Sequence, residues 1–228
     1  MSIVSRDDEL RVRFHPGQWE AHTSDARFKI LSCGRRWGKT TWAWIELLVD
    51  ALRTGGVYWW IAPLYKELMP VSRTIREITP KTLIKNSFER NNVFRYIQLP
   101  NGAEIYFHSA DREDSLRGEK LHGAVIDEGG FLKPNRYEAE IRPCLMDYQG
   151  WAIIIGTPKG RNWFYEMYLR GQDREAFPDY ESWQMPSYIN TVENCGFLQT
   201  REIDTMVAEL PELIAKQEVY AQFLAGEG

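Results

Sequence analysis

The chain has 228 residues, a formal net charge of −4 and three scattered cysteines. This length can bury a full hydrophobic core and indicates one large domain, or one domain with a small appendage. The net charge argues against a protein coated with basic residues. The cysteines form neither a metal cluster nor a disulfide framework, and the sequence shows neither a bilayer-length apolar run nor a signal peptide, so we expect a reducing, cytosolic setting.

Strand-like runs alternate with helix-like stretches along most of the chain. The pattern predicts strands at 28–32, 57–62, 124–127 and 151–156, and helices at 40–52, 68–78, 134–146 and 162–170. This alternation predicts an α/β fold with a mostly parallel central sheet flanked by helices. The tryptophans at 59 and 60 fit a buried interior strand better than base stacking.

Two further regions depart from this alternation. Alternating runs on either side of Asn101-Gly102 predict a hairpin, and a polar, densely charged loop at 109–120 follows it. After Gly171 we expect one last strand at 180–184 and then two helices within 200–224, broken at Leu210-Pro211. The sequence therefore predicts a core at 1–175 and a small C-terminal helical subdomain at 176–228.

The segment Leu31-Ser-Cys-Gly-Arg-Arg-Trp-Gly-Lys-Thr-Thr41 leaves the first predicted strand and opens the first predicted helix. Backbone N–H groups of such a loop cradle phosphates, while Lys39 adds a positive charge and the Thr40 hydroxyl binds Mg²⁺. The loop departs from the strict pattern, because Cys33 takes the first glycine position and Gly34 follows it. Without further support, a surface loop rich in glycine and arginine remains the alternative. The candidate nucleotide-binding residues are Cys33, Gly34, Arg35, Arg36, Trp37, Gly38, Lys39, Thr40 and Thr41.

A second segment, Ala124-Val-Ile-Asp-Glu128, is an apolar strand that ends in two acids. Asp127 would hold the Mg²⁺ shell together with Thr40, and Glu128 would polarise a water for attack on the γ-phosphate. Ligands of parallel sheets bind beyond the carboxyl ends of the strands, where both segments would meet. The two segments together predict a Mg²⁺-dependent ATP hydrolase, with ATP and Mg²⁺ as its ligands.

Gln18, Gly34-Arg-Arg-Trp-Gly-Lys-Thr40, Val125-Ile-Asp-Glu128 and Ile154-Ile-Gly-Thr-Pro-Lys-Gly160 together resemble the ATPase domain of the large terminase subunit. That family packages DNA into the procapsids of tailed bacteriophages, and the resemblance covers about residues 10–225. It implies a P-loop NTPase fold of the additional-strand type, with the Asp-Glu pair as its Walker B end and the C-terminal subdomain as a lid.

The resemblance also implies roles for single residues. Gln18 resembles the adenine-recognising glutamine, and Arg35 a loop arginine that contacts the γ-phosphate within the same subunit. Thr157 matches the coupling motif, although a capping threonine before Pro158 is the alternative. Arg117 resembles the arginine that acts on a neighbouring subunit's site; pairing with Asp114 or Glu119 is its alternative. Arg112 and Arg95 are candidates for contact with DNA.

The implied partners are double-stranded DNA, the portal protein and the small terminase subunit. The resemblance implies a homo-oligomeric ring on the procapsid and a monomer in isolation, in the host cytoplasm, without a membrane and absent from the mature virion. A nuclease domain is not expected in this chain, and we expect no DNA cleavage. The alternative hypotheses are a helicase-type ATPase acting on DNA, a phosphotransferase, and a nucleotide-binding assembly module.

Overall fold

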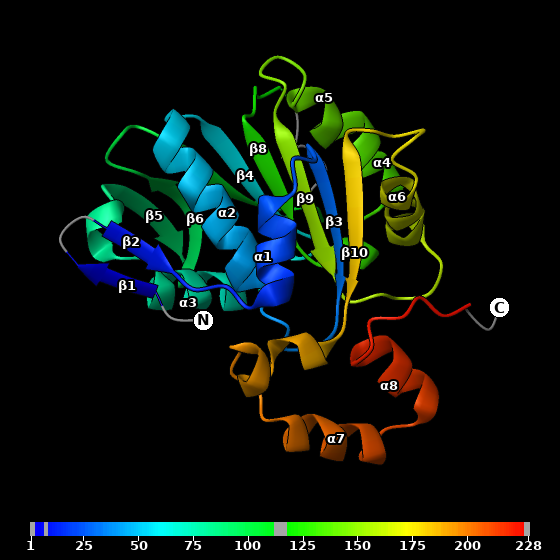
Figure 1. Cartoon of the computed structure of the whole chain (residues 1–228). Coiled ribbons are helices and arrows are strands. Elements are labelled where there is room, and N and C mark those ends of the chain that lie inside the picture. The colour runs from blue at the N-terminus through cyan, green and yellow to red at the C-terminus, as the bar shows by residue number, and fades with distance from the viewer. Residues whose placement is uncertain (1–2, 7–8, 112–117, 226–228) are drawn as a thin grey trace. The chain divides into compact units, whose positions relative to one another are not determined.

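The computed structural model describes residues 3–6, 9–111 and 118–225 (Figure 1). The chain forms two compact units: the first contains 1–39 and 156–228, and the second contains 40–155. Both are built from β-strands and α-helices, so the fold is of the α/β class, with mostly parallel strands. No helix in the described ranges is long and apolar enough to cross a membrane.

The bounds of the regular elements follow the chain. The strands are β1 (Ile3–Arg6), β2 (Glu9–Val12), β3 (Phe28–Cys33), β4 (Val57–Ala62), β5 (Asn86–Arg90), β6 (Val93–Gln98), β7 (Glu104–Ser109), β8 (Gly123–Ile126), β9 (Trp151–Gly156) and β10 (Tyr180–Met185). The helices are α1 (Pro16–Thr23), α2 (Lys39–Thr54), α3 (Leu68–Ile78), α4 (Pro134–Arg136), α5 (Arg142–Cys144), α6 (Trp163–Gln172), α7 (Thr200–Glu209) and α8 (Glu212–Glu218).

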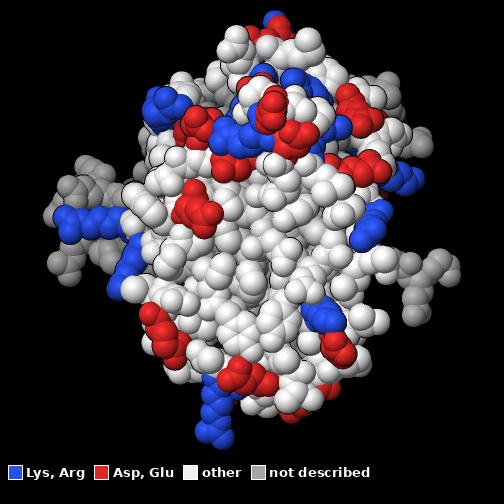
Figure 2. All heavy atoms as spheres, turned by 45° about the vertical axis from the view of Figure 1, so that its right-hand side comes forward, with Lys and Arg blue, Asp and Glu red and all other residues white. Residues whose placement is uncertain are grey.

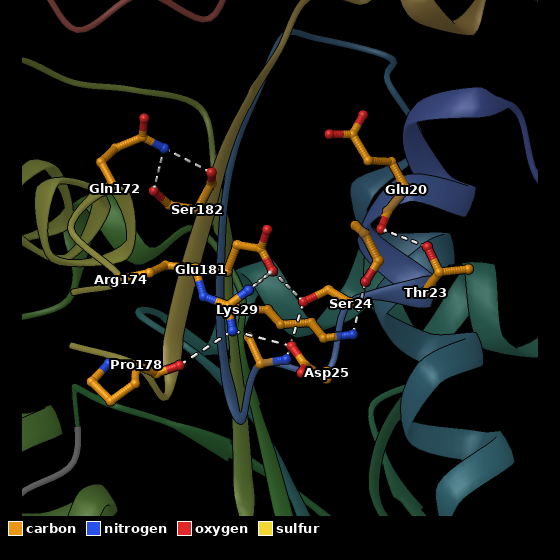
Figure 3. Close-up of polar contacts among 12 residues, drawn as sticks. Glu20, Thr23, Ser24, Asp25, Lys29, Gln172, Arg174, Pro178, Glu181 and Ser182 are labelled. Atoms are coloured by element: carbon orange, nitrogen blue, oxygen red, sulfur yellow. Dashed lines mark hydrogen bonds and ion pairs between the residues drawn. The ribbon is translucent and has the colours of Figure 1, made fainter.

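In the first unit β3 and β10 run parallel, with Phe28 opposite Tyr180 and Cys33 opposite Met185. Every residue of β3 is buried, as expected for a parallel strand covered on both faces. Helix α6 packs against both strands, and its Gln172 amide donates to the Ser182 carbonyl and hydroxyl at 2.8 and 2.9 Å (Figure 3). The last predicted strand is therefore confirmed as a partner of β3.

Other side chains of β3 and β10 point toward the end of α1, on the opposite side from Gln172 (Figure 3). Lys29 on β3 donates to the Ala21 carbonyl at 2.7 Å, and the Ser24 hydroxyl lies 2.5 Å from Glu181 on β10. Successive residues of a strand point to opposite faces, so Glu181 contacts Ser24 after α1, whereas Ser182 contacts Gln172 of α6. The strand pair is thus tied to an element on each face.

The second unit contains a sheet with strand order β9-β8-β4-β7-β6-β5. The first four strands are parallel, whereas β6 and β5 are antiparallel to their neighbours. Asn101-Gly102 joins β6 to β7, which confirms the predicted hairpin. Helix α2 covers this sheet, because the Trp44 ring packs against the rings of Trp60 and Phe107. Trp59 and Trp60 are both buried, as predicted.

One predicted helix is wrong in its detail. Residues 134–146 were expected to form a continuous helix, but α4 is followed by a π-helical turn, Tyr137–Ile141, before α5 ends at Cys144. Pro143 has no N–H and cannot donate to the carbonyl four residues earlier, so the regular ladder is interrupted there. The N–H of Arg142 instead reaches the carbonyl of Tyr137, five residues back.

Sequence reasoning missed the β5–β6 hairpin and the β1–β2 pair. Asn91 and Asn92 connect β5 to β6, and both have positive φ, at 52° and 58°, as the favoured two-residue hairpin turn requires. The Asn-Asn pair was the available signal. The predicted break at Leu210-Pro211 is confirmed between α7 and α8, although the second helix ends at Glu218 rather than at Leu224.

Candidate functional site: a phosphate-binding loop

Residues 34–38 connect β3 to α2 in the loop that the sequence predicted to bind phosphates. Two residues of the loop have left-handed backbones: Arg36 with φ 61° and Gly38 with φ 94°. Glycine reaches such angles without strain, but a non-glycine residue such as Arg36 pays a conformational cost of about 1 kcal/mol or more. The loop therefore has a tight, specified shape rather than that of an ordinary surface connection.

Gly34 is required by the chain that passes beside it. A Cβ atom at this position would lie 2.4 Å from the Val219 carbonyl oxygen and 2.5 Å from the Ser187 hydroxyl. The Gly34 N–H donates to the Met185 carbonyl at 2.8 Å, which continues the pairing of β3 with β10 past the end of the strands. The glycine that follows Cys33 is thus explained by this close approach, and Cys33 itself is the buried last residue of β3.

Four side chains donate hydrogen bonds to consecutive carbonyl groups of the loop. The Ser187 hydroxyl binds the Arg35 carbonyl at 2.7 Å, and the Asn190 amide binds that of Arg36 at 2.6 Å. His15 binds the Trp37 carbonyl through Nε2 at 3.0 Å, and Gln18 binds that of Gly38 at 3.5 Å. Each of these carbonyls is therefore directed toward a side chain supplied by another segment.

In two of these peptide groups the backbone N–H remains available to a ligand. The planar trans peptide directs its N–H opposite to its C=O. The carbonyls of Arg35 and Trp37 are held by Ser187 and His15, and in the described part of the chain the N–H groups of Arg36 and Gly38, across the same two peptide bonds, donate to no protein oxygen. Free backbone donors in a tight loop ahead of a helix are what an anion requires.

His15 is neutral in this arrangement. Its Nδ1 accepts the N–H of Gln18 at 3.3 Å, at the start of α1, and its Nε2 must then carry the proton that it donates to the Trp37 carbonyl. Burial lowers the pKa of His15, against the raising effect of the hydrogen bond to Trp37. The Trp37 ring packs edge-on against the imidazole, with centroids 4.9 Å apart.

Gln18 is buried, and both ends of its amide are engaged. Its Oε1 accepts the N–H of His15 at 3.3 Å, which completes a reciprocal cap on α1, while its Nε2 faces the Gly38 carbonyl. One amide hydrogen and one lone pair of the side chain are not used by these bonds. The residue predicted to recognise adenine is thus placed directly beside the loop.

Lys39 and Thr157 meet in the first unit. The Lys39 ammonium donates to the Thr157 hydroxyl at 3.4 Å, although the two residues are 118 positions apart in the sequence. Thr157 is 6% exposed and follows the last residue of β9. The structure therefore brings together two predicted site residues, the loop lysine and the threonine of the second resemblance motif.

Arg35 is paired with Glu218 at the end of α8. The guanidinium forms an ion pair with the Glu218 carboxylate, and the Arg35 N–H donates to the Glu218 carbonyl at 2.7 Å. The Arg35 side chain is 62% exposed, whereas that of Glu218 is 11% exposed. The Arg36 side chain makes a different contact, because its guanidinium lies over the Phe197 ring, 5.7 Å from the centroid.

The two acids lie in the second unit, just after β8. Asp127 is 5% exposed, and its carboxylate accepts the N–H of Glu128 at 2.9 Å. Glu128 has a left-handed backbone, with φ 48° and ψ 49°, and precedes a 3₁₀ turn at Gly129–Phe131. Such strain in a non-glycine residue is characteristic of functional sites, because the surrounding structure must maintain it. Thr40 and Thr41 lie in the first turn of α2, whose N–H groups have no partner within the helix.

Of the three arginine candidates, Arg95 lies among the described residues. Arg95 lies on β6 with its guanidinium over the Tyr65 ring, 5.4 Å from the centroid. Arg112 and Arg117 fall outside the described residues. In Figure 2 acidic and basic side chains lie next to one another at the top and around the edges of a broad area without charged side chains, so charge does not mark a path for DNA on that face.

Sequence reasoning missed several residues that shape the loop: His15, Ser187, Asn190 and Glu218. The position of His15 before a proline at a helix start was a usable signal for His15 as a cap. For the other three no local signal existed, because their contacts with the loop span more than 150 residues of sequence.

Comparison with known proteins places the chain in a family. Residues 30–228 match the family described as "Terminase large subunit, T4likevirus-type, N-terminal". The chain therefore belongs to the large subunits of viral terminases. It is 28% identical over 246 residues to the terminase large subunit of Thermus phage G20c, covering 95% of this chain and 50% of that protein. The chain thus spans about half the length of this curated relative.

Solved structures agree with this assignment. The fold matches the large terminase ATPase domain of Thermus phage P74-26 with a TM-score of 0.74 and 26% identity, over 93% of this chain and 94% of that one. It also matches the large terminase of another thermophilic bacteriophage, solved in complex with ADP, with a TM-score of 0.72 and 16% identity, over 93% of this chain and 54% of that one. The chain has the fold of a large terminase ATPase domain.

Proposed function

We propose that this chain is the motor domain of a DNA-packaging terminase, which hydrolyses ATP to move double-stranded viral DNA into a procapsid. The observation that carries the proposal is the loop at 34–38, whose Arg36 and Gly38 amides are available to an anion directly before Lys39. The similarity to the P74-26 ATPase domain, which covers nearly all of both chains, supports the same activity.

The ligand contacts divide among a few residues. The loop amides and Lys39 bind the phosphates, with Arg35 at the γ-phosphate once it leaves Glu218. Gln18, held beside Gly38, contacts the adenine edge with the donor and acceptor that its cap leaves unused. Thr157, beside the Lys39 ammonium, senses the γ-phosphate and couples its loss to the rest of the subunit.

Asp127 and Thr40 would hold Mg²⁺ in this proposal. Asp127 supplies a buried carboxylate and Thr40 a hydroxyl, which are the oxygen ligands that Mg²⁺ prefers when phosphates complete its shell. Bound there, the ion would offset the charge of the phosphate oxygens. The described residues contain no cluster of three or more His, Cys, Asp and Glu side chains that could hold a metal without such help.

Glu128 is the general base of this proposal. It accepts a proton from the attacking water, and its left-handed backbone sets the direction in which the side chain leaves the main chain. Arg117 would act on a neighbouring subunit's site, and Arg112 and Arg95 would contact DNA. The partners are DNA, the portal protein and the small terminase subunit, in a ring on the procapsid in the host cytoplasm. In this proposal, residues 1–175 form the additional-strand P-loop core and residues 176–228 form the lid.

Release of phosphate from ATP tests the proposal. Purified protein with ATP and Mg²⁺ should release phosphate slowly when dilute, and the rate per subunit should rise with concentration if Arg117 acts in trans. Lys39→Ala should weaken both ADP binding and turnover, with Lys66→Ala, on an exposed turn far from the loop in sequence, as the control. Protein that binds neither ADP nor ATP would contradict the proposal, and a rate that is independent of concentration would exclude the trans role of Arg117.

A further inference from the structure

The phosphate loop is not held by its own residues. Three neighbouring peptide groups, 35–36, 36–37 and 37–38, are each fixed by one outside side chain: Ser187, Asn190 and His15, respectively. Ser187 and Asn190 both belong to one 3₁₀ turn, Ser187–Asn190, which follows β10. All three side chains are buried, at 2–3% exposure, so water does not compete for the loop carbonyls.

The direction of each peptide follows from these contacts. Rotating the 35–36 or 37–38 peptide would break the bond to Ser187 or His15 and leave a buried hydroxyl or imidazole without its partner. Rotation would also turn the Arg36 or Gly38 N–H away from the direction it now has. The 36–37 peptide is held from both sides, since the Asn190 amide binds its carbonyl and its N–H donates to the Gly34 carbonyl at 3.3 Å.

The turn that carries these donors is itself anchored beside the loop. The Ser187 N–H donates to the Val219 carbonyl at 2.8 Å, the same oxygen that a Cβ atom at position 34 would meet first. The backbone of Asn190 is fixed as well, because its carbonyl accepts the N–H groups of Phe197 and Leu198 at 3.2 and 3.0 Å. The donors thus sit on a short rigid element, and they need not be ordered again when a ligand arrives.

We propose that Ser187, Asn190 and His15 are positioning residues for nucleotide binding. Ser187 and His15 hold the carbonyls of Arg35 and Trp37 outward so that the Arg36 and Gly38 amides face the phosphates, and Asn190 fixes the 36–37 peptide between them. The proposal rests on the function proposed above and adds residues that touch the loop but not the nucleotide. Because the pre-set loop binds phosphates in the ground state and in the transition state alike, losing a positioning contact should raise the KM for ATP more than it lowers kcat.

The test measures ADP affinity by calorimetry in the full chain for Ser187→Ala, Asn190→Ala and the double variant. Asn194→Ala is the matched control, because its amide donates to the Tyr188 carbonyl and the Thr191 hydroxyl near the same turn, not to the loop. Each single variant should bind ADP about five-fold to ten-fold more weakly, the worth of one buried hydrogen bond, while the control binds like the original protein.

A second readout separates positioning from a loss of stability. On addition of ADP, the amide NMR signals of Arg36 and Gly38 should shift in the original protein and in Asn194→Ala. In the two single variants they should be broadened or displaced before ADP is added. Thermal unfolding identifies any variant that has simply lost its fold. The ADP affinity and the amide signals of the other single variant then test the positioning role.

The outcomes separate the two proposals. If the original protein does not bind ADP, the proposed function fails. If it binds ADP, and the variants bind it equally well whether or not their melting temperatures fall, the positioning roles are wrong and the proposed function stands. Weaker binding by the variants alone, with unchanged melting temperatures, supports the positioning roles.

Discussion

At the scale of single residues, the site depends on backbone angles that most residues avoid. Arg36 and Glu128 both have left-handed backbones, one in the loop at 34–38 and one just after β8. Neither is a glycine, so each conformation costs about 1–3 kcal/mol that surrounding contacts must offset. Glycine or asparagine would adopt these angles at a lower cost, so both positions carry strain that the rest of the structure must maintain.

Replacement of the proposed base separates turnover from folding. We expect Glu128→Gln to reduce ATP turnover at least about 100-fold, because an amide cannot accept the proton, with little change in ADP affinity or melting temperature. Glu138→Gln, an exposed acid on the following π-helical turn, is the matched control and should retain full activity. Phosphate release and calorimetric titration give both quantities. Full turnover by Glu128→Gln would show that another group serves as the base.

At the scale of elements, helix α1 is held at both ends. Its first turn is capped by His15 and Gln18, which also bind the Trp37 and Gly38 carbonyls. At its other end Lys29 donates to the Ala21 carbonyl, one of the last helix carbonyls without an intrahelical partner (Figure 3). A cation at a helix C-terminus also interacts favourably with the helix dipole. The predicted adenine contact therefore depends on β3 as well as on α1.

Two cations near this end of α1 should differ in their effects on stability. Lys29 is 9% exposed, so Lys29→Met should lower the free energy of unfolding by about 1–2 kcal/mol through the lost hydrogen bond. The Arg174 side chain is 42% exposed and pairs with Asp25 and Glu181 at 3.1 and 3.2 Å, so Arg174→Ala should cost less than about 1 kcal/mol. Urea denaturation measures both. An equal or larger loss for Arg174→Ala would contradict this assignment.

At the scale of the whole molecule, each unit contains a histidine that folding keeps neutral. His15 belongs to the first unit and His108, on β7, to the second. Burial lowers the pKa of His108 to about 4, and the positive charge of Arg95 adds to this effect. The His108 ring lies 4.7 Å from that of Trp59, and in the described part of the chain its Nε2 has no hydrogen-bond partner. Both units should therefore lose stability in mild acid.

The sign and the range of this effect follow from the lowered pKa. As the pH falls below about 6.5, the unfolded chain binds a proton at His108 before the folded chain does, so stability decreases until the folded His108 protonates near pH 4. Between pH 7 and pH 5 this histidine alone should cost about 2 kcal/mol. Denaturation of His108→Asn at both pH values should show a drop smaller by that amount, and an identical drop would rule out His108 as a source.

The sequence predicted the regular elements well where burial and strand propensity agreed. The strands at 57–62 and 151–156 have the predicted bounds, because continuous apolar runs in a parallel sheet leave little choice of position. It failed at the π-helical turn near Pro143, where one missing N–H changes the hydrogen-bond ladder without changing the apolar pattern. It also missed the short β1–β2 and β5–β6 hairpins.

For the site, too, features that depend on neighbouring residues could be predicted, and features that depend on long-range contacts could not. The sequence alone was enough to predict the order strand, loop and helix around residues 34–38, and the position of Asp127 and Glu128 at a strand end, since these depend on neighbouring residues. The folded structure was needed to find which side chains direct the loop carbonyls, and why position 34 must be glycine. The contacts of Ser187 and Asn190 join segments more than 150 residues apart, and no periodicity or spacing in the chain encodes a hydrogen bond that forms only after folding has brought its partners together.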